Sequence, residues 1–146
     1  MRLTAHADYA LRLLMYLAVQ EDELITISAS AEHYGISKNH LMKVAHKLGQ
    51  LGYIETVRGR SGGLRLARDA NSINIGDVVR EIEVGDALVA CFPNGSGGCL
   101  ISPSCRLKGI LAEAIEAFFQ SLDQFTLANL VDGNNPLKKA LSLDPK

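Results

Sequence analysis

The three cysteines of this 146-residue chain all lie within residues 91–105, a segment rich in glycine, proline and serine. Cys91, Cys99 and Cys105 follow the spacing C-x7-C-x5-C. Thiolates are soft ligands that suit iron–sulfur clusters and zinc, and a glycine-rich loop can wrap them around a compact cofactor. A disulfide would leave one thiol over, and structural zinc usually takes paired C-x2–4-C ligands, which this chain lacks. The spacing therefore favours an iron–sulfur cluster, with zinc as the alternative.

A fourth ligand is needed, because three thiolates leave one position of an all-cysteine cluster unfilled. It would be a carboxylate, a histidine, water or a group from a second subunit. Oxygen and nitrogen bind more weakly than thiolate at such a site, so this position would be open to small molecules and could serve in sensing. The sequence leaves the choice open among Asp8, Glu83, Asp86, His6, His33, His40 and His46.

The net charge of −1 looks unsuited to a nucleic-acid-binding protein, but the basic residues are concentrated in one segment. Residues 37–68 contain seven lysine and arginine side chains and one glutamate, a local charge of +6. The flanking segments 1–36 and 69–146 are acidic, at −3 and −4. A basic segment on an otherwise acidic chain is typical of a local phosphate-binding surface.

Two helices are expected before the basic segment. Thr4 is a good N-cap for a helix over about residues 5–20, which has leucines along one face. A shorter helix is expected over about 28–34, opened by Ser28.

The basic segment itself predicts a third helix and a hairpin. Gly35 supplies a tight turn, and Ser37 is expected to cap a helix over about residues 38–51. The strand-like runs YIETVRG and LRLA then flank the glycine-rich RSGG, which is typical of a two-stranded hairpin. Helix, turn, helix and basic hairpin follow the order of a winged helix-turn-helix, with the helix-turn-helix at about residues 28–51.

In such a fold the start of the second helix of the motif reads base edges in the major groove. The side chains expected there are Ser37, Lys38, Asn39, His40 and Lys43. Asparagine can pair with adenine, and lysine with guanine or phosphate. The hairpin adds Arg58, Arg60, Ser61, Gly62 and Gly63, and arginine suits a narrow minor groove. These charges could simply be solvated, but their coincidence with the motif favours DNA binding.

The C-terminal half predicts a further helix from Asn74 or Ser72 to about Val84, and a long helix over about residues 105–130. The long helix is apolar over a wide stripe that one small domain cannot cover. We expect the same helix of a second subunit to cover it, which would give a two-fold dimer, although packing within one chain is the alternative.

The expected fold class is therefore mainly α, a winged helix-turn-helix with a two-stranded β wing and a long C-terminal dimerisation helix. The expected domains are a DNA-binding domain at residues 1–70, a cluster-binding loop and dimerisation helix at 71–132, and a flexible tail at 133–146.

Four stretches of the sequence resemble one family of regulators. They are LTAHADYALRLLMYLA, YGISKNHLMKVAHKLGQLGYIETVRGRSGGLRLA, INIGDVVREIE and the cysteine loop ending in PSCRLK. They are similar to the NsrR repressors, nitric-oxide-sensing members of a larger family of iron–sulfur winged-helix regulators that includes IscR. The resemblance covers about residues 1–135, and its most specific feature is RGRSGG beside a three-cysteine loop.

The resemblance implies a homodimeric transcriptional repressor with one cluster per subunit. Its loaded form would bind double-stranded DNA at an AT-rich inverted-repeat operator and release it when nitric oxide attacks the cluster. Cys91, Cys99 and Cys105 match the cluster ligands of the family, and Asp8 matches an aspartate that serves some members as a fourth ligand from the partner subunit. Members hold [2Fe–2S] or [4Fe–4S] clusters, and the sequence leaves the type open.

Other functions were weighed against this one. A regulator of the same fold could sense iron–sulfur supply or redox state, or use zinc or bare thiols. An enzyme with a reactive cysteine is disfavoured because no Cys–His pairing is evident. No apolar run approaches the ~18–20 residues that a membrane span needs, and no export signal is evident. We therefore expect a cytoplasmic regulator without a membrane partner, and not an enzyme.

Overall fold

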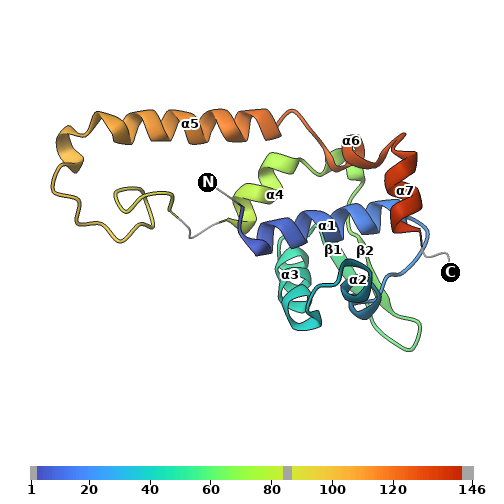
Figure 1. Ribbon diagram of the computed structural model, residues 1–146. Coiled ribbons are helices and arrows are strands. Elements are labelled where there is room, and N and C mark those ends of the chain that lie inside the picture. Colours follow the sequence, from blue (N-terminus) through green and yellow to red (C-terminus); the bar gives the residue numbers. More distant parts are fainter. Residues whose placement is uncertain (1–2, 84–86, 143–146) are drawn as a thin grey trace.

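The computed structural model describes residues 3–83 and 87–142, so Val84 and Asp86 lie outside the described residues. Helices make up most of the described chain, together with an antiparallel hairpin (Figure 1). In chain order the elements are α1 (Ala5–Val19), α2 (Ile27–Tyr34), α3 (Lys38–Gln50), β1 (Ile54–Val57), β2 (Gly63–Leu66), the 3-10 turn η1 (Ala70–Ser72), α4 (Ile75–Ile82), the 3-10 turn η2 (Ser102–Ser104), α5 (Arg106–Leu122), α6 (Leu127–Val131) and α7 (Asn135–Leu141). None of the described helices is both long and apolar enough to cross a membrane.

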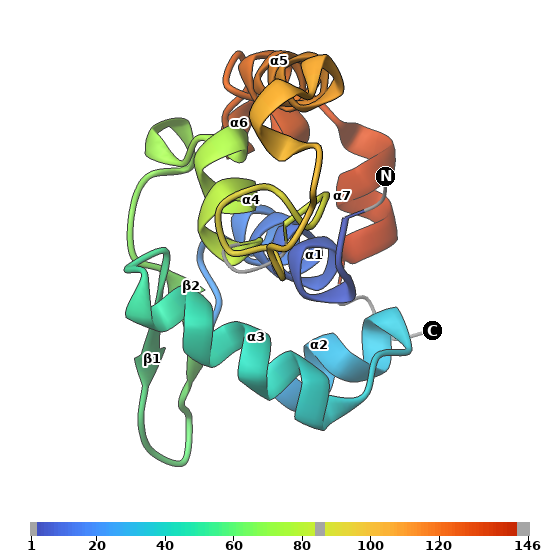
Figure 2. The same ribbon diagram turned by 90° about the vertical axis from the view of Figure 1, so that its left-hand side faces the viewer.

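Helix α1 lies at the centre of the molecule and packs against α3, α4, α6 and β2 (Figures 1 and 2). It begins where predicted, because the Thr4 side chain accepts a hydrogen bond of 3.2 Å from the Ala7 backbone N–H. Side chains from both halves of the chain meet on α1 in one core that includes Leu13, Leu14, Leu41, Leu48, Ile73, Val78 and Leu127. The core thus includes residues from both sides of residue 70. The division into domains at this residue stays a prediction.

The helix-turn-helix consists of α2, a tight turn and α3. The sequence predicted Ser28 as the cap of α2, but Thr26 has this role and accepts a hydrogen bond of 3.0 Å from the Ala29 N–H. Gly35 ends the helix in the left-handed conformation, at φ 63°, as a tight turn requires. Ser37 stands at the N-cap of α3, but its side chain makes no capping hydrogen bond, contrary to the prediction.

The hairpin pairs β1 with β2 in antiparallel register, with Ile54 opposite Leu66 and Val57 opposite Gly63. A Cβ atom on Gly62 would overlap with the Val57 carbonyl oxygen, so the tip of the hairpin requires glycine there. On its other edge, Leu64 exchanges backbone hydrogen bonds with Ile25, and this bridge attaches the hairpin to the segment before α2.

The single helix predicted over residues 105–130 is wrong, because the chain leaves the helix after α5 and resumes it only in α6. Hydrogen bonds from the start of α4 stabilise the non-helical segment between α5 and α6. The Asn74 side-chain amide donates to the Asp123 carbonyl oxygen at 2.7 Å, and the Ile75 N–H donates to the Phe125 carbonyl oxygen at 3.0 Å. Asn74 also caps α4 through the Asp77 N–H, which settles the choice between Asn74 and Ser72.

Part of the predicted flexible tail is a helix, α7, instead. Asn134 caps it by accepting a hydrogen bond from the Leu137 N–H. Leu141 is buried, and its carbonyl oxygen accepts a 2.7 Å hydrogen bond from the Gln20 side chain at the end of α1. Burial of this leucine gives residues 135–141 a reason to order, which the preceding Gly-Asn-Asn-Pro sequence concealed.

Candidate nucleic-acid interface and cysteine loop

Helix α3 has one buried and one exposed face. Leu41, Val44, Ala45 and Leu48 are buried in the core, as the spacing predicted. The five residues predicted to read DNA are all exposed: Ser37, Lys38, Asn39, His40 and Lys43. The structure therefore leaves the start of α3 free to approach a ligand, as a helix in the major groove must be.

The hairpin tip carries the second group of predicted contacts. Arg58, Arg60 and Ser61 are exposed, and Gly62 is half-buried. In both views α3 and the hairpin tip lie on the side of α1 away from α5 (Figures 1 and 2). The two basic elements thus face one side of the molecule, and α5 occupies the opposite side.

The charges of the basic segment are not equivalent. Arg65 forms an ion pair with Glu55 across the hairpin. Among the residues that the structure describes, no ion pair involves Lys38, Lys43, Arg58 or Arg60. These four cations lie at the start of α3 and near the hairpin tip, so they are available to an anionic ligand such as phosphate.

Arg68 has a structural role that the sequence did not reveal. Its guanidinium donates hydrogen bonds to the carbonyl oxygens of Leu51 and Gly52 at 2.8 and 2.9 Å, and it lies 4.3 Å from the centre of the Tyr53 ring. The Tyr53 hydroxyl donates to Glu81 at 2.5 Å. The pKa of this phenol is raised mainly by burial and, to a lesser extent, by the hydrogen bond to Glu81. Arg68 therefore covers the end of α3, and the hydrogen bond between Tyr53 and Glu81 connects this end to α4.

The cysteine loop follows a series of tight turns. The Gly97 N–H donates to the Ala90 carbonyl oxygen at 2.8 Å, which brings the two ends of one turn together. Asn94, Gly97 and Gly98 adopt positive φ angles within or beside it. Cys91 and Cys105 are half-buried and Cys99 is exposed. Residues 91–105 thus form a loop, as their composition predicted.

The donor set fits an iron–sulfur cluster in kind, since three thiols lie free in one loop. The loop does not gather them in this conformation: within residues 3–83 and 87–142, no three His, Cys, Asp or Glu side chains lie close enough to share a metal ion. Several apolar side chains around the loop are exposed, among them Leu100 at 94% and Ile101 at 62%. The loop conformation is therefore one that a cofactor or a partner would have to complete.

Two of the predicted fourth ligands have hydrogen-bond partners in or beside α1. Both Asp8 carboxylate oxygens contact Arg12, at 3.0 Å to Nε and 2.9 Å to Nη2. Glu83 accepts hydrogen bonds from the Thr4 backbone N–H at 2.8 Å and from its hydroxyl at 2.9 Å. Asp8 is thus paired within α1, and Glu83 is paired with the residue that caps this helix.

The remaining candidates are separated from one another. His33 stacks on Tyr16, with ring centres 5.1 Å apart, and His40 and His46 are exposed on α3. His6 is exposed on α1, and Asp86 lies outside the described residues. The choice of fourth ligand stays open.

Helix α5 has no buried residue, although it is rich in apolar side chains. Leu107 and Ile110 are 58% and 61% exposed, and Phe125 beyond the helix is 47% exposed. A surface patch of this kind on a soluble domain usually marks an interface.

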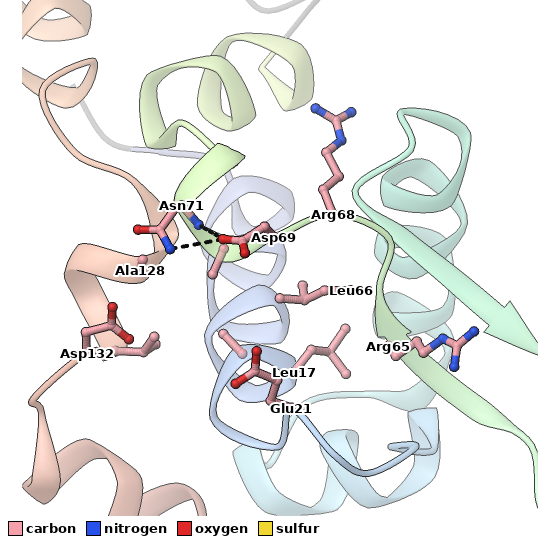
Figure 3. A pocket seen from close by; sticks show the side chains of 12 residues that line it. Leu17, Glu21, Arg65, Leu66, Arg68, Asp69, Asn71, Ala128 and Asp132 are labelled. Carbon is pink, nitrogen blue, oxygen red and sulfur yellow. Dashed lines mark hydrogen bonds between the residues drawn. The ribbon is translucent and has the colours of Figure 1, made fainter.

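A cleft between α1, β2, η1 and α6 is lined by both apolar and charged side chains (Figure 3). Leu17 and Leu66 line it together with Asp69, which accepts hydrogen bonds from the backbone and side chain of Asn71 at 2.7 and 3.0 Å. Arg65 and Arg68 at its edge are engaged by the contacts given above. Three of the charged groups of this cleft, Arg65, Arg68 and Asp69, thus serve local structure.

Comparison with known proteins places these features in context. Residues 3–133 match the family model Rrf2, described as an iron-dependent transcriptional regulator. The HTH-type transcriptional regulator NsrR of Bacillus subtilis is 49% identical over 98% of this chain and 99% of its own length. The protein of the same name from Shouchella clausii is 48% identical, over 97% of this chain and 95% of its own.

Solved structures support the fold. The oxidised form of Staphylococcus aureus CymR has a TM-score of 0.72 at 26% identity, covering 90% of this chain and 97% of its own. T. potens IscR has a TM-score of 0.71 at 22% identity, covering 93% and 90% of the two chains, which is a likeness of fold alone. The predicted winged helix-turn-helix is thereby confirmed.

Proposed function

The chain belongs to the Rrf2 family of transcriptional regulators and is not an enzyme, and on this premise we propose that it is an iron–sulfur-dependent repressor. It binds an inverted-repeat operator as a homodimer and releases the DNA when nitric oxide attacks the cluster. The observation that carries the proposal is the combination of exposed cations at the start of α3 and the hairpin tip, without ion pairs, with three free thiols in one loop.

DNA binding rests on the exposed start of α3. Asn39 and His40 offer hydrogen-bonding groups for base edges, and Lys38 and Lys43 offer charge for guanine or phosphate. Arg58 and Arg60 extend the contact to the neighbouring groove, where Gly62 lets the backbone come close. Because phosphate contacts dominate affinity, binding should weaken steeply as salt rises.

The dimer rests on the apolar surface of α5. Two copies that pack these helices together would cover Leu107 and Ile110 and present two α3 helices to one operator. A two-fold protein of this kind matches an inverted repeat, whose half-sites lie about 34 Å apart.

The cluster would be held by Cys91, Cys99 and Cys105, with Asp8 of the partner subunit as the candidate fourth ligand. When bound, the cluster supplies iron that reacts with nitric oxide. The oxygen ligand would be the weakest of the four bonds. Asp8 stands on α1, which packs on α3, so a bond from Asp8 to the partner's loop would fix the separation of the two α3 helices.

Serine substitutions of the cysteines test the proposal, with Ser96→Ala in the same loop as the matched control. We expect Cys91→Ser, Cys99→Ser and Cys105→Ser, purified without air, to lose the visible absorption of the cluster and high-affinity operator binding. Ser96→Ala should keep both, and nitric oxide should release operator from the wild type and the control. Cysteine variants that bind and release the operator like the wild type would contradict the proposal.

Two alternatives have their own outcomes in the same samples. Colourless protein with stoichiometric zinc would indicate a zinc- or thiol-based regulator. Coloured protein that holds its operator in the presence of nitric oxide would indicate a regulator of iron–sulfur supply or redox state. An Asp8→Ala protein with normal operator binding and normal response would separately remove Asp8 from the ligand set.

A further inference from the structure

Helix α5 is attached to the rest of the molecule near its C-terminal end. Its opposite end projects beyond the other helices, toward the cysteine loop (Figure 1). With 17 residues the helix is about 25 Å long, so a tilt of about 10° at the attached end would move the far end by about 4 Å. The contacts at the attached end therefore determine where the exposed apolar surface points.

An ion pair between Arg80 of α4 and Asp123 after α5 forms this attachment. Arg80 Nη1 donates to Asp123 Oδ1 at 2.7 Å, and Nη2 donates to Oδ2 at 2.6 Å. The guanidinium also lies 4.6 Å from the centre of the Phe119 ring, in the last turns of α5. Two parallel hydrogen bonds and a stacked ring restrict the angle between the two helices as well as their distance.

Gly76 shows how closely the two parts approach each other. A Cβ atom at this position would overlap with Asp123 Oδ1 and come within 3.1 Å of the Asp123 backbone nitrogen. Glycine disfavours a helix, so its presence in the first turn of α4 fits a need for this approach. The bonds from Asn74 and Ile75 to the same segment complete a packed junction with little room for movement.

We infer that the Arg80–Asp123 pair is a positioning contact that sets the half-site spacing at which a dimer accepts an operator. Helix α5 packs on α4, α4 packs on α1, and α1 packs on α3. The orientation of α5 relative to α3 is therefore determined by this series of helix contacts. If two subunits meet through α5, its angle fixes the distance between the two α3 helices. The inference rests on the proposed dimer and adds the residues that define its geometry.

Selection of operators from a random-sequence DNA library tests the inference, using anaerobically purified full-length protein. We expect the wild type to select inverted repeats of one dominant spacing, and Asp123→Asn to select a range of spacings with at least a tenfold loss of preference. Gly76→Ala should broaden the spacing in the same way. Asp77→Asn is the matched control, because Asp77 reaches Arg80 only at 3.4 Å, and it should select as the wild type does.

Sedimentation and thermal unfolding of each variant separate the possible failures. Folded, dimeric Asp123→Asn with the wild-type spacing would overturn the inference while leaving the proposed function intact. A wild type that binds its operator as a monomer would overturn the proposed dimer itself. Should Asp123→Asn fail to fold, Arg80→Lys removes the paired hydrogen bonds while keeping the charge, and an unchanged spacing in that variant would be equally decisive.

Discussion

The DNA-reading part, residues 26–66, and the outer arm, residues 87–122, are built in opposite ways. In the first, every helix and strand places side chains in the common core, and α3 alone buries four residues. In the second, α5 buries none, and the loop before it exposes Leu100 and Ile101. The reading part is complete within one chain. The arm exposes apolar side chains of the kind that a core contains, which is what the proposed cofactor and second subunit would cover.

Matched truncations of Leu41 in α3 and Ile110 in α5 should give the largest contrast. Leu41 is fully buried and Ile110 is 61% exposed. Leu41→Ala should lower the free energy of unfolding by about 2–5 kcal/mol, because it leaves a cavity in the core. Ile110→Ala should change the unfolding of the monomer by about 0.5 kcal/mol or less and weaken self-association instead. Urea unfolding and sedimentation measure the two effects, and equal losses of stability would abolish the contrast.

Alanine at two glycines should have effects of opposite sign. Gly62→Ala places a Cβ atom against the Val57 carbonyl oxygen and should cost about 1–3 kcal/mol, together with operator affinity. Gly109 lies within α5 with no atom near the position of an added Cβ. Gly109→Ala should therefore stabilise the chain by about 0.4–1 kcal/mol. Thermal unfolding provides the comparison, and a destabilised Gly109→Ala would show that this face of α5 is already packed.

The next contrast lies within the basic segment, between Lys43 and Arg65. Lys43 is exposed without an ion pair, whereas Arg65 pairs with Glu55. Lys43→Ala should reduce the slope of operator affinity against salt by about 1 for each copy of α3 bound. Arg65→Ala should leave this slope nearly unchanged. Titrations over a range of salt concentrations measure it, and identical slopes for both variants would exclude Lys43 from the phosphate contacts.

Tyr34 offers a contrast that depends on pH. Its hydroxyl donates to the Arg12 carbonyl oxygen at 3.0 Å, so Tyr34→Phe should cost about 0.5–1.5 kcal/mol. Burial raises the pKa of Tyr34 to about 12, although the positive charge of Arg12 acts to lower it. A raised pKa means that this stabilisation is present below pH 10 and is lost as the pH rises from 10 toward 12. Tyr9→Phe is the control, and wild-type and Tyr34→Phe proteins that lose stability equally over this range would refute the assignment.

The reading part was largely predictable because its signals are local. Gly35 acts through neighbours within four residues, and the leucine spacing of α3 fixes its buried face. Ser28 misled because Thr26, two residues earlier, is also a good cap. The residue pattern does not separate the two, since both precede an apolar run.

The arm and its junction were less predictable because their contacts are distant in sequence. The apolar pattern continues through residues 123–126, but Asn74 bonds there from 49 positions away and ends the helix. Leu141 likewise orders α7 only through α1. The basic residues were correctly placed on the motif, yet the sequence could not show that Arg65 and Arg68 are held by the protein itself. The cysteine ligands and the DNA contacts stay predictions.

The account depends most on whether iron held by the cysteine loop governs DNA binding. The direct measurement is the operator affinity of one anaerobic preparation before and after its iron is removed by chelation, with iron and sulfide determined on the same samples. We predict a coloured protein with iron and sulfide in each subunit that loses high-affinity binding as the iron is removed. A preparation that contains no iron and still binds its operator tightly would contradict the account.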